Sequence, residues 1–270
     1  MAISDMSGVA SAAANAQQLI WSKANVTAVA GRMCSLWSGA GAPGVGSTTL
    51  GQAATGTVPT DASTGAMPYT NAPSGQMYLL NMEAQGSGTG TVFLWDLVWT
   101  WGSGGSGWSV TTTTAQNTSS PTALTRPDAN GADIEAWFEV LATMGAGAAT
   151  PVLSYTDQDG NTGNTTGTLG YNSAAIIGSM YQFPLATGDT GVRSIQSLTT
   201  SVSMTSGTAR INLMRRLATV PITVAQVEGG KSWDRVALPK IYDDSCLMIT
   251  LLPTSTTSGP LQVKLDIGYA

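Results

Sequence analysis

Thr91-Val-Phe-Leu-Trp-Asp-Leu-Val-Trp-Thr-Trp101 is the most strand-like segment of the chain, because it is rich in β-branched and aromatic residues and contains neither glycine nor proline. Similar short segments, separated by turn residues, recur at 77–83, 108–114, 151–156, 192–204, 208–217, 219–224, 246–252 and 261–267. Apolar and polar residues alternate strictly over 261–267, which predicts one buried and one exposed face. About ten short strands with this spacing predict an all-β chain folded as a β-sandwich with jelly-roll-like connections.

Residues 132–143 fit two patterns. A helical stripe would hold Ile134, Trp137, Phe138 and Leu141. A strand would bury Ile134, Ala136, Phe138, Val140 and Ala142 and place Asp133, Glu135 and Glu139 on its other face. We favour the strand, because β segments flank it and the glycine-rich link at 145–149 suits a hairpin to the next strand.

The N-terminal quarter differs from the rest. Residues 11–20 contain good helix formers and predict a short helix, and 25–30 and 32–37 read as extended. Residues 38–76 are mostly Gly, Ala, Pro, Ser and Thr with almost no charge, which suggests an extended arm lying on another surface, such as a neighbouring subunit. We therefore divide the chain into an N-terminal arm, 1–75, and a β-sandwich domain, 76–270.

The composition excludes several classes of protein. Charged residues make up 10% of the 270 residues, against about 25% in an average protein, and histidine is absent. Without an imidazole there is no Ser-His-Asp triad, no Cys-His pair and no His-ligated zinc. The net charge of −5 argues against a nucleic-acid partner. No segment reads as a signal peptide or as a membrane span.

The charge is unevenly distributed along the chain. Residues 1–190 hold three basic and eleven acidic residues, a formal charge of −8, and residues 191–270 hold eight basic and five acidic residues, or +3. This split fits solvated strand faces, or a basic patch that meets an acidic patch on a neighbouring copy. The two cysteines, Cys34 and Cys246, have no metal-binding spacing; two buried thiols are favoured over a disulfide.

Two motifs resemble ligand-binding loops. Gly41-Ala-Pro-Gly-Val-Gly-Ser-Thr48 is one residue away from a phosphate-binding loop, but Ser47 stands where the essential lysine belongs and no helix is predicted to follow. Asp157-Gln-Asp-Gly-Asn161 resembles the start of a calcium loop but lacks the acidic residue near its twelfth position. Asp-Gly between two strands is also a common hairpin signal, so we favour turns in both places.

Three further groups of residues suggest chemistry. Asp133, Glu135 and Glu139 on one strand face would be spaced like a glycosidase carboxylate pair, although solvated acids are commoner. Trp95, Trp99 and Trp101 alternate along one strand, as in a sugar-binding platform, a sandwich core or a subunit interface. Asp243-Asp244 reads as a turn, and the sequons at Asn25, Asn117 and Asn164 matter only in a glycosylating secretory route. We assign no catalytic, cofactor-binding or metal-binding residue.

Several segments resemble, in order and spacing, a group of tailed-bacteriophage virion structural proteins that mostly lack assigned roles. The segments are 34–44 with 65–71; 93–99 with 114–117, 135–141 and 155–163; and 183–198 with 213–219. The likeness covers most of the chain but includes no catalytic motif, so it carries over no functional residue. It implies a β-sandwich component present in many copies in a virion.

On this basis we expect a non-enzymatic capsid decoration, or cement, protein without a cofactor. Its expected partners are its own copies, in a dimer or trimer, and the major capsid protein, with neither nucleic acid nor membrane. We expect it in the virion, after synthesis in the cytoplasm of a bacterial host. The alternatives are a tail or head-to-tail component, a carbohydrate-binding adhesin that uses Trp99, and an enzyme that relies on carboxylates such as Glu135.

Overall fold

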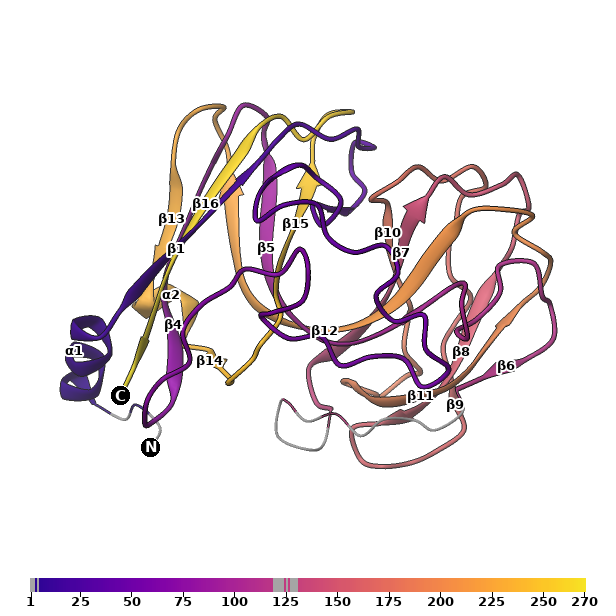
Figure 1. Ribbon diagram of the computed structural model, residues 1–270, viewed down its shortest axis with the longest axis horizontal. Coiled ribbons are helices and arrows are strands. Elements are labelled where there is room, and N and C mark those ends of the chain that lie inside the picture. The colour runs from indigo at the N-terminus through magenta and orange to yellow at the C-terminus, as the bar shows by residue number, and fades with distance from the viewer. Residues whose placement is uncertain (1–2, 4, 119–123, 125, 127–130) are drawn as a thin grey trace. The chain divides into compact units, whose positions relative to one another are not determined.

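The computed structural model describes residues 3, 5–118, 124, 126 and 131–270, and over these the chain is mostly β-structure (Figure 1). The elements are α1 (Met6–Ala14), β1 (Gln17–Lys23), β2 (Cys34–Ser35), β3 (Gly41–Ala42), β4 (Met77–Gly86), β5 (Gly90–Gly102), β6 (Gln116–Asn117), β7 (Ile134–Ala142), β8 (Pro151–Asp157), β9 (Asn164–Thr165), β10 (Met180–Gln182), β11 (Val192–Thr200), β12 (Thr208–Ile222), β13 (Gly229–Ser232), α2 (Trp233–Val236), β14 (Lys240–Ile241), β15 (Leu247–Pro253) and β16 (Leu261–Tyr269).

The chain divides into two compact units, each with its own core. Unit 1 comprises Met1–Gly46, Thr60–Asp96 and Leu217–Ala270, and unit 2 comprises Ser47–Pro59 and Leu97–Arg216. Two long strands contribute to both units, since β5 passes from one to the other after Asp96 and β12 does so after Arg216. This grouping differs from the sequence-based division at residues 75 and 76.

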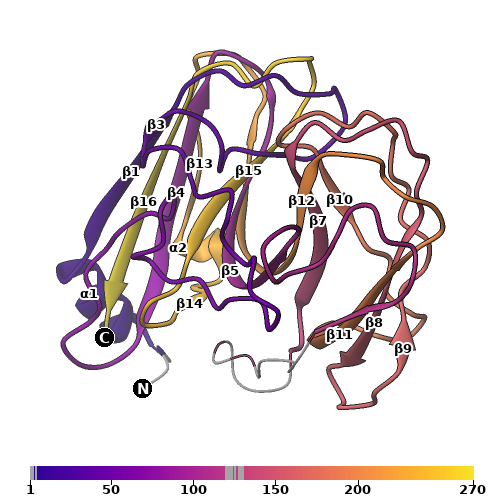
Figure 2. The same cartoon turned by 45° about the vertical axis from the view of Figure 1, so that its right-hand side comes forward.

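Unit 1 is built around an antiparallel sheet with the strand order β13-β4-β16-β1-β3, to which β14 is added on β4 (Figure 2). Its inner face packs with β15, the first half of β5 and the last part of β12. In β16 the side chains of Leu261, Val263, Leu265 and Ile267 are all buried, so the predicted alternation is confirmed. Burying each such side chain stabilises the fold by about 1.5–3 kcal/mol.

Unit 2 holds a second core between two groups of strands. The first comprises β10, β7, the first part of β12 and the second half of β5, and the second has the order β6-β11-β8-β9. Their facing side chains form one apolar cluster that includes Trp101, Phe138, Leu153, Ile195 and Ile211. An all-β sandwich architecture with one short N-terminal helix is therefore confirmed.

The strand predicted over 132–143 is confirmed as β7, but the predicted hairpin to β8 is wrong. β7 pairs with β10 and β12, whereas β8 pairs with β11 and β9. The glycine-rich link carries the chain from one sheet to another, and it lies against the 201–206 turn. A Cβ added at Gly147 would come within 2.0 Å of the Ser203 carbonyl oxygen, so only glycine permits this close approach.

The predicted helix is displaced in the structure. α1 begins five residues earlier than expected, because the Asp5 carboxylate accepts a hydrogen bond from the Gly8 amide at 2.9 Å and caps the helix. Residues 17–20 belong instead to β1, where Leu19, Trp21 and Lys23 are buried and the residues between them are exposed. Pairing with β16 along its whole length outweighs the local preference for helix.

One predicted strand, 108–114, is a loop in the structure, and the extended segment 25–30 joins no sheet as a strand. Residues 108–114 leave the sheet at Trp108, and the backbone N–H of Ser109 donates to the side-chain oxygen of Gln116 at 2.5 Å. The side-chain amide of Gln116 donates back to the Ser109 carbonyl at 2.9 Å and thereby replaces a partner strand. Residues 25–30 form only an isolated bridge from Thr27 to Thr257. Conversely, the two strands expected over 208–224 form the single strand β12.

The charge-poor segment 38–76 lies on the chain's own strands. Thr57 pairs with Thr100 of β5, and the Gln52 side-chain amide donates to the Ser103 carbonyl at 2.8 Å. Further along, the Met67 amide donates to the Leu247 carbonyl of β15 at 3.4 Å. The surface that this arm was expected to cover therefore includes β5 and β15 of the same chain.

Candidate functional site

A cavity of unit 2 lies where β10 separates from β7, and its volume is about 540 Å³. The pairing register would place Pro184 opposite Glu135, and proline has no N–H to continue the ladder. The chain turns away from β7 at this point, and the Gly167 amide donates a hydrogen bond to the Pro184 carbonyl at 2.8 Å. The cavity wall includes Glu135, Gln182, Asp189, Thr168 and Thr190.

Glu135 lies in this wall with its carboxylate already engaged. Its Oε2 atom accepts hydrogen bonds from Trp137 Nε1 and Gln182 Nε2, each at 3.0 Å, and Oε1 lies 3.3 Å from Arg216. Burial raises the pKa of Glu135, while Arg216 and then Trp137 oppose the shift. The raised pKa is typical of a general acid, but the three donors fix this carboxylate in the sheet.

The second carboxylate of the cavity, Asp189, accepts a hydrogen bond from the hydroxyl of Tyr155. The same Tyr155 oxygen accepts from the Ala186 amide at 2.9 Å. Burial raises the pKa of Tyr155 to about 12, and the hydrogen bond to Asp189 adds to the shift. The pair anchors the loop after β10 to β8.

The three acidic residues expected on one strand face occupy three different environments. Asp133 precedes β7 in a turn, with φ at 61°, and is exposed. Glu135 lines the cavity. Glu139 is buried, and its Oε2 accepts from Arg210 Nε at 2.6 Å and from Asn212 Nδ2 at 2.7 Å. The glycosidase-like arrangement is therefore wrong, because no two of these carboxylates face a shared open space.

The buried network around Glu139 was missed from the sequence. It joins three strands, because Asn212 on β12 also accepts from the Thr100 hydroxyl of β5 at 2.8 Å. All four side chains are buried. A signal existed in the alternation of Arg210 and Asn212 with the apolar Ala209, Ile211 and Leu213, but sequence alone does not reveal that β7 supplies the matching carboxylate.

The calcium-like motif at Asp157 is a hairpin loop between β8 and β9, as favoured. The Asp157 carboxylate accepts hydrogen bonds from the amides of Asp159 and Asn161 and from the side chains of Asn161 and Asn164, at 2.8–3.0 Å. Desolvation raises the pKa of Asp157, but these hydrogen bonds outweigh it and lower the pKa below its ordinary value. Within the described ranges, no group of three or more Asp, Glu or Cys side chains is arranged to hold a metal ion.

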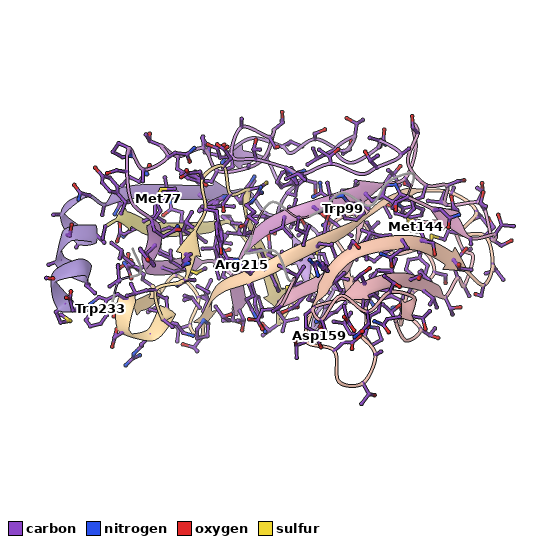
Figure 3. All side chains as sticks on the ribbon, turned by 90° about the horizontal axis from the view of Figure 1, so that it is seen from below. Met77, Trp99, Met144, Asp159, Arg215 and Trp233 are labelled. Atoms are coloured by element: carbon purple, nitrogen blue, oxygen red, sulfur yellow. The ribbon has the colours of Figure 1, made fainter. Side chains whose placement is uncertain are left out.

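The tryptophans of β5 form no platform for a sugar. Trp95, Trp99 and Trp101 are at most 2% exposed, so the platform interpretation is wrong. Trp95 Nε1 donates to Thr250 Oγ1 at 2.9 Å, and Trp99 Nε1 donates to the Thr55 carbonyl at 3.3 Å. Trp99 lies on β5 among densely packed side chains (Figure 3).

The segment that resembles a phosphate-binding loop presents carbonyl oxygens instead of N–H groups. Lys23 Nζ donates to the carbonyls of Gly39, Pro43 and Gly44 at 3.1, 2.7 and 3.3 Å. Phosphate recognition needs N–H donors, whereas this loop surrounds the chain's own ammonium group. Burial lowers the pKa of Lys23 to about 8.

The two cysteines are buried thiols, the favoured alternative. Cys34 pairs with Leu251 near one end of β15, while Cys246 precedes the other end. Five residues of strand separate Leu251 from Cys246, which corresponds to about 17 Å, and a disulfide needs Cα atoms within about 7 Å.

The remaining candidates lie in turns and loops. Asp244, with φ at 58°, accepts from Asn71 Nδ2 at 2.9 Å in a turn before β15, as expected for Asp243-Asp244. Of the sequon residues, Asn25 accepts from the Gly259 amide, Asn164 holds Asp157, and Asn117 is exposed on β6.

Part of the uneven charge is neutralised within the chain. Three basic side chains of residues 191–270 pair with acids of residues 1–190, as Arg210–Glu139, Arg216–Glu135 and Lys264–Glu83. Antiparallel pairing of β12 with β7 and of β16 with β4 brings these groups together. These three ion pairs form within one chain. They therefore fit neither the interpretation as separate solvated faces nor the interpretation as a contact between copies.

Comparison with known proteins adds little. No protein family matches the chain, and no curated protein matches it. Among solved structures, it is similar to the VP2 subviral particle of infectious bursal disease virus, with 9% identity, a TM-score of 0.20, and coverage of 94% of this chain and 80% of that chain. Particles of the same virus with T=1 symmetry give 8% identity, a TM-score of 0.19, and coverage of 94% and 77%. These TM-scores are too low to indicate a shared fold.

In the described part of the chain, no helix is both long and apolar enough to cross a membrane.

Proposed function

We propose that the chain is a non-enzymatic structural protein of a virion, and specifically a capsid decoration protein of a tailed bacteriophage. The observation that supports a structural role best is the placement of its reactive side chains. The carboxylates of Glu135 and Glu139 hold strands together, and the tryptophans of β5 are buried. The virion assignment is supported by the sequence resemblance to phage virion proteins and by the charge-poor composition.

The proposal is tested in the phage whose genome encodes the chain. Deleting its gene should leave heads that assemble but release their DNA at a lower temperature than wild-type heads. Adding the purified chain to the deficient heads should restore their heat resistance and label their surface in immunoelectron microscopy. A chain that is absent from purified virions would overturn the proposal, and labelling confined to the tail would replace it with the tail alternative.

A further inference from the structure

We propose that the outer face of the unit 1 sheet carries a binding site for an uncharged, polyhydroxylated ligand, that is, a neutral glycan. The site is a cavity of about 500 Å³, within the range that small-molecule sites occupy. Its wall includes Ser22, Gln85, Ser87, Gln226, Pro260 and Gln262. The site lies within unit 1 and does not depend on the virion proposal.

The polar groups of this cavity come from three adjacent strands in register. Ser22 of β1 pairs with Gln262 of β16, which pairs with Gln85 of β4. Neighbouring strands lie about 4.8 Å apart, so the row spans about 10 Å. Gln226 lines the same cavity from the loop after β12. Its backbone N–H donates to the Gly86 carbonyl at 2.7 Å, which leaves its side-chain amide unengaged.

The amides of this row are available to a ligand. Among the described residues, the exposed side chains of Gln85, Gln226 and Gln262 have no hydrogen-bond partner in the protein, and each offers an acceptor oxygen and two donor hydrogens. In the unit 2 cavity, by contrast, Gln182 already donates to Glu135. Sugar hydroxyls both donate and accept, so they match the three glutamines that line one cavity.

The charges around the cavity favour an uncharged ligand. Lys23 contributes to the wall, but its ammonium donates to the carbonyls of the 39–44 loop. In the neighbouring row, Lys264 lies 3.0 Å from Glu83 and 3.8 Å from Glu228. Glu83 and Glu228 together with Lys264 carry a net negative charge beside the cavity, which disfavours anionic ligands. Ile20, 49% exposed on the same face of β1, offers an apolar contact for the C–H face of a sugar ring.

The test uses the purified full chain, labelled with ¹⁵N, and four soluble neutral oligosaccharides: maltoheptaose, cellopentaose, mannopentaose and chitopentaose. Each is added up to about 10 mM, so that a Kd near 1 mM is detected. At least one should shift the side-chain amide signals of Gln85, Gln226 and Gln262. Replacing Gln262→Ala or Gln85→Ala should weaken that binding about 3- to 10-fold, since each removes hydrogen bonds between neutral groups.

Gln18→Ala is the matched control, because Gln18 is exposed on the same face of β1 but lies outside the cavity wall. It should leave the affinity unchanged, and thermal melts should show that all three variants are folded. The proposal is overturned if none of the four oligosaccharides shifts the three amides, or if Gln262→Ala and Gln18→Ala bind equally. Binding only by a sulfated oligosaccharide, abolished by salt, would also overturn it.

Discussion

At the scale of single residues, Glu139 is a carboxylate buried among the strands of unit 2. Its side chain is 1% exposed. It accepts hydrogen bonds from Arg210 and from Asn212, which lie two residues apart on the neighbouring strand β12. Removing two ions from water is costly, and the cost is offset only while both remain paired and hydrogen bonded. Replacing any one residue of this network by an apolar one should therefore lower the stability of the fold.

We expect Glu139→Ala to lower the free energy of unfolding by about 3–5 kcal/mol, because it leaves the buried Arg210 guanidinium without its carboxylate. Glu135→Ala is the matched control on the same strand, and it should cost less, about 1–2 kcal/mol, because its ion-pair partner Arg216 is 54% exposed and its other donors, Trp137 and Gln182, are neutral. Urea denaturation measures both. Equal losses for the two variants would contradict this account of Glu139.

Lys23 should make stability depend on pH. The folded chain lowers its pKa to about 8 from an ordinary value of 10.5, so between these values the unfolded chain binds more protons. Stability should therefore rise as the pH increases from 8 to 10.5, by up to about 3 kcal/mol, and by less where water screens the ammonium. Comparing urea denaturation of the wild type with Lys23→Met across this range isolates the effect. If Lys23→Met keeps the same pH dependence of stability, that dependence comes from another titratable group.

At the scale of elements, α1 is held by a close backbone contact. Ala12 is fully buried against β16, and a Cβ added at Gly268 would lie 2.0 Å from the Ala12 carbonyl oxygen. Both views show the helix beside the ends of β4 and β16 (Figures 1 and 2). The helix is short, so this packing sustains it.

Gly268→Ala should displace α1 and leave the sheet folded. Hydrogen exchange of the amides in 6–14 should accelerate at least tenfold, which corresponds to about 1.4 kcal/mol. Gly44→Ala is the control, because a Cβ there meets nothing within 4 Å. Unchanged exchange in Gly268→Ala would mean that the helix does not depend on this contact.

The elements that could be predicted from sequence are those whose own residues carry a strong pattern. β16 alternates strictly, and β7 has apolar residues at every second position, so both were identified. Residues 17–20 of β1 were assigned to the helix because 11–20 holds good helix formers and no breaker, and the exposed apolar side chain of Ile20 weakens the strand alternation. The Glu139 network and the Gln85–Gln262 row could not be predicted, because each depends on the register between strands far apart in the sequence.

At the scale of the whole molecule, the two units have separate cores but share two strands. Residues on one part of β5 and β12 pack in the first core, and residues further along the same strands pack in the second. Four of the eight tryptophans lie in each unit, so fluorescence reports on both.

We expect the chain to unfold in one cooperative transition, because losing either core frees strands that the other core needs. Curves followed by tryptophan fluorescence and by far-ultraviolet circular dichroism should superimpose. Leu265→Ala in unit 1 and Ile211→Ala in unit 2 should each shift that single curve by about 2–5 kcal/mol. Two transitions, each sensitive to only one substitution, would show that the units unfold independently.

The pairing of β1 with β16 has a consequence for synthesis on the ribosome. The residues of unit 2 are all made once Arg216 is added, but unit 1 waits for Leu217–Ala270. At about 5–20 residues per second, this delay is roughly 3–10 s. During it, β1 and β4 both lack β16, the strand that lies between them in the finished sheet. A nascent chain truncated in this interval would leave one edge of β1 and one edge of β4 uncovered, so β16 protects the much earlier strand β1 from aggregation.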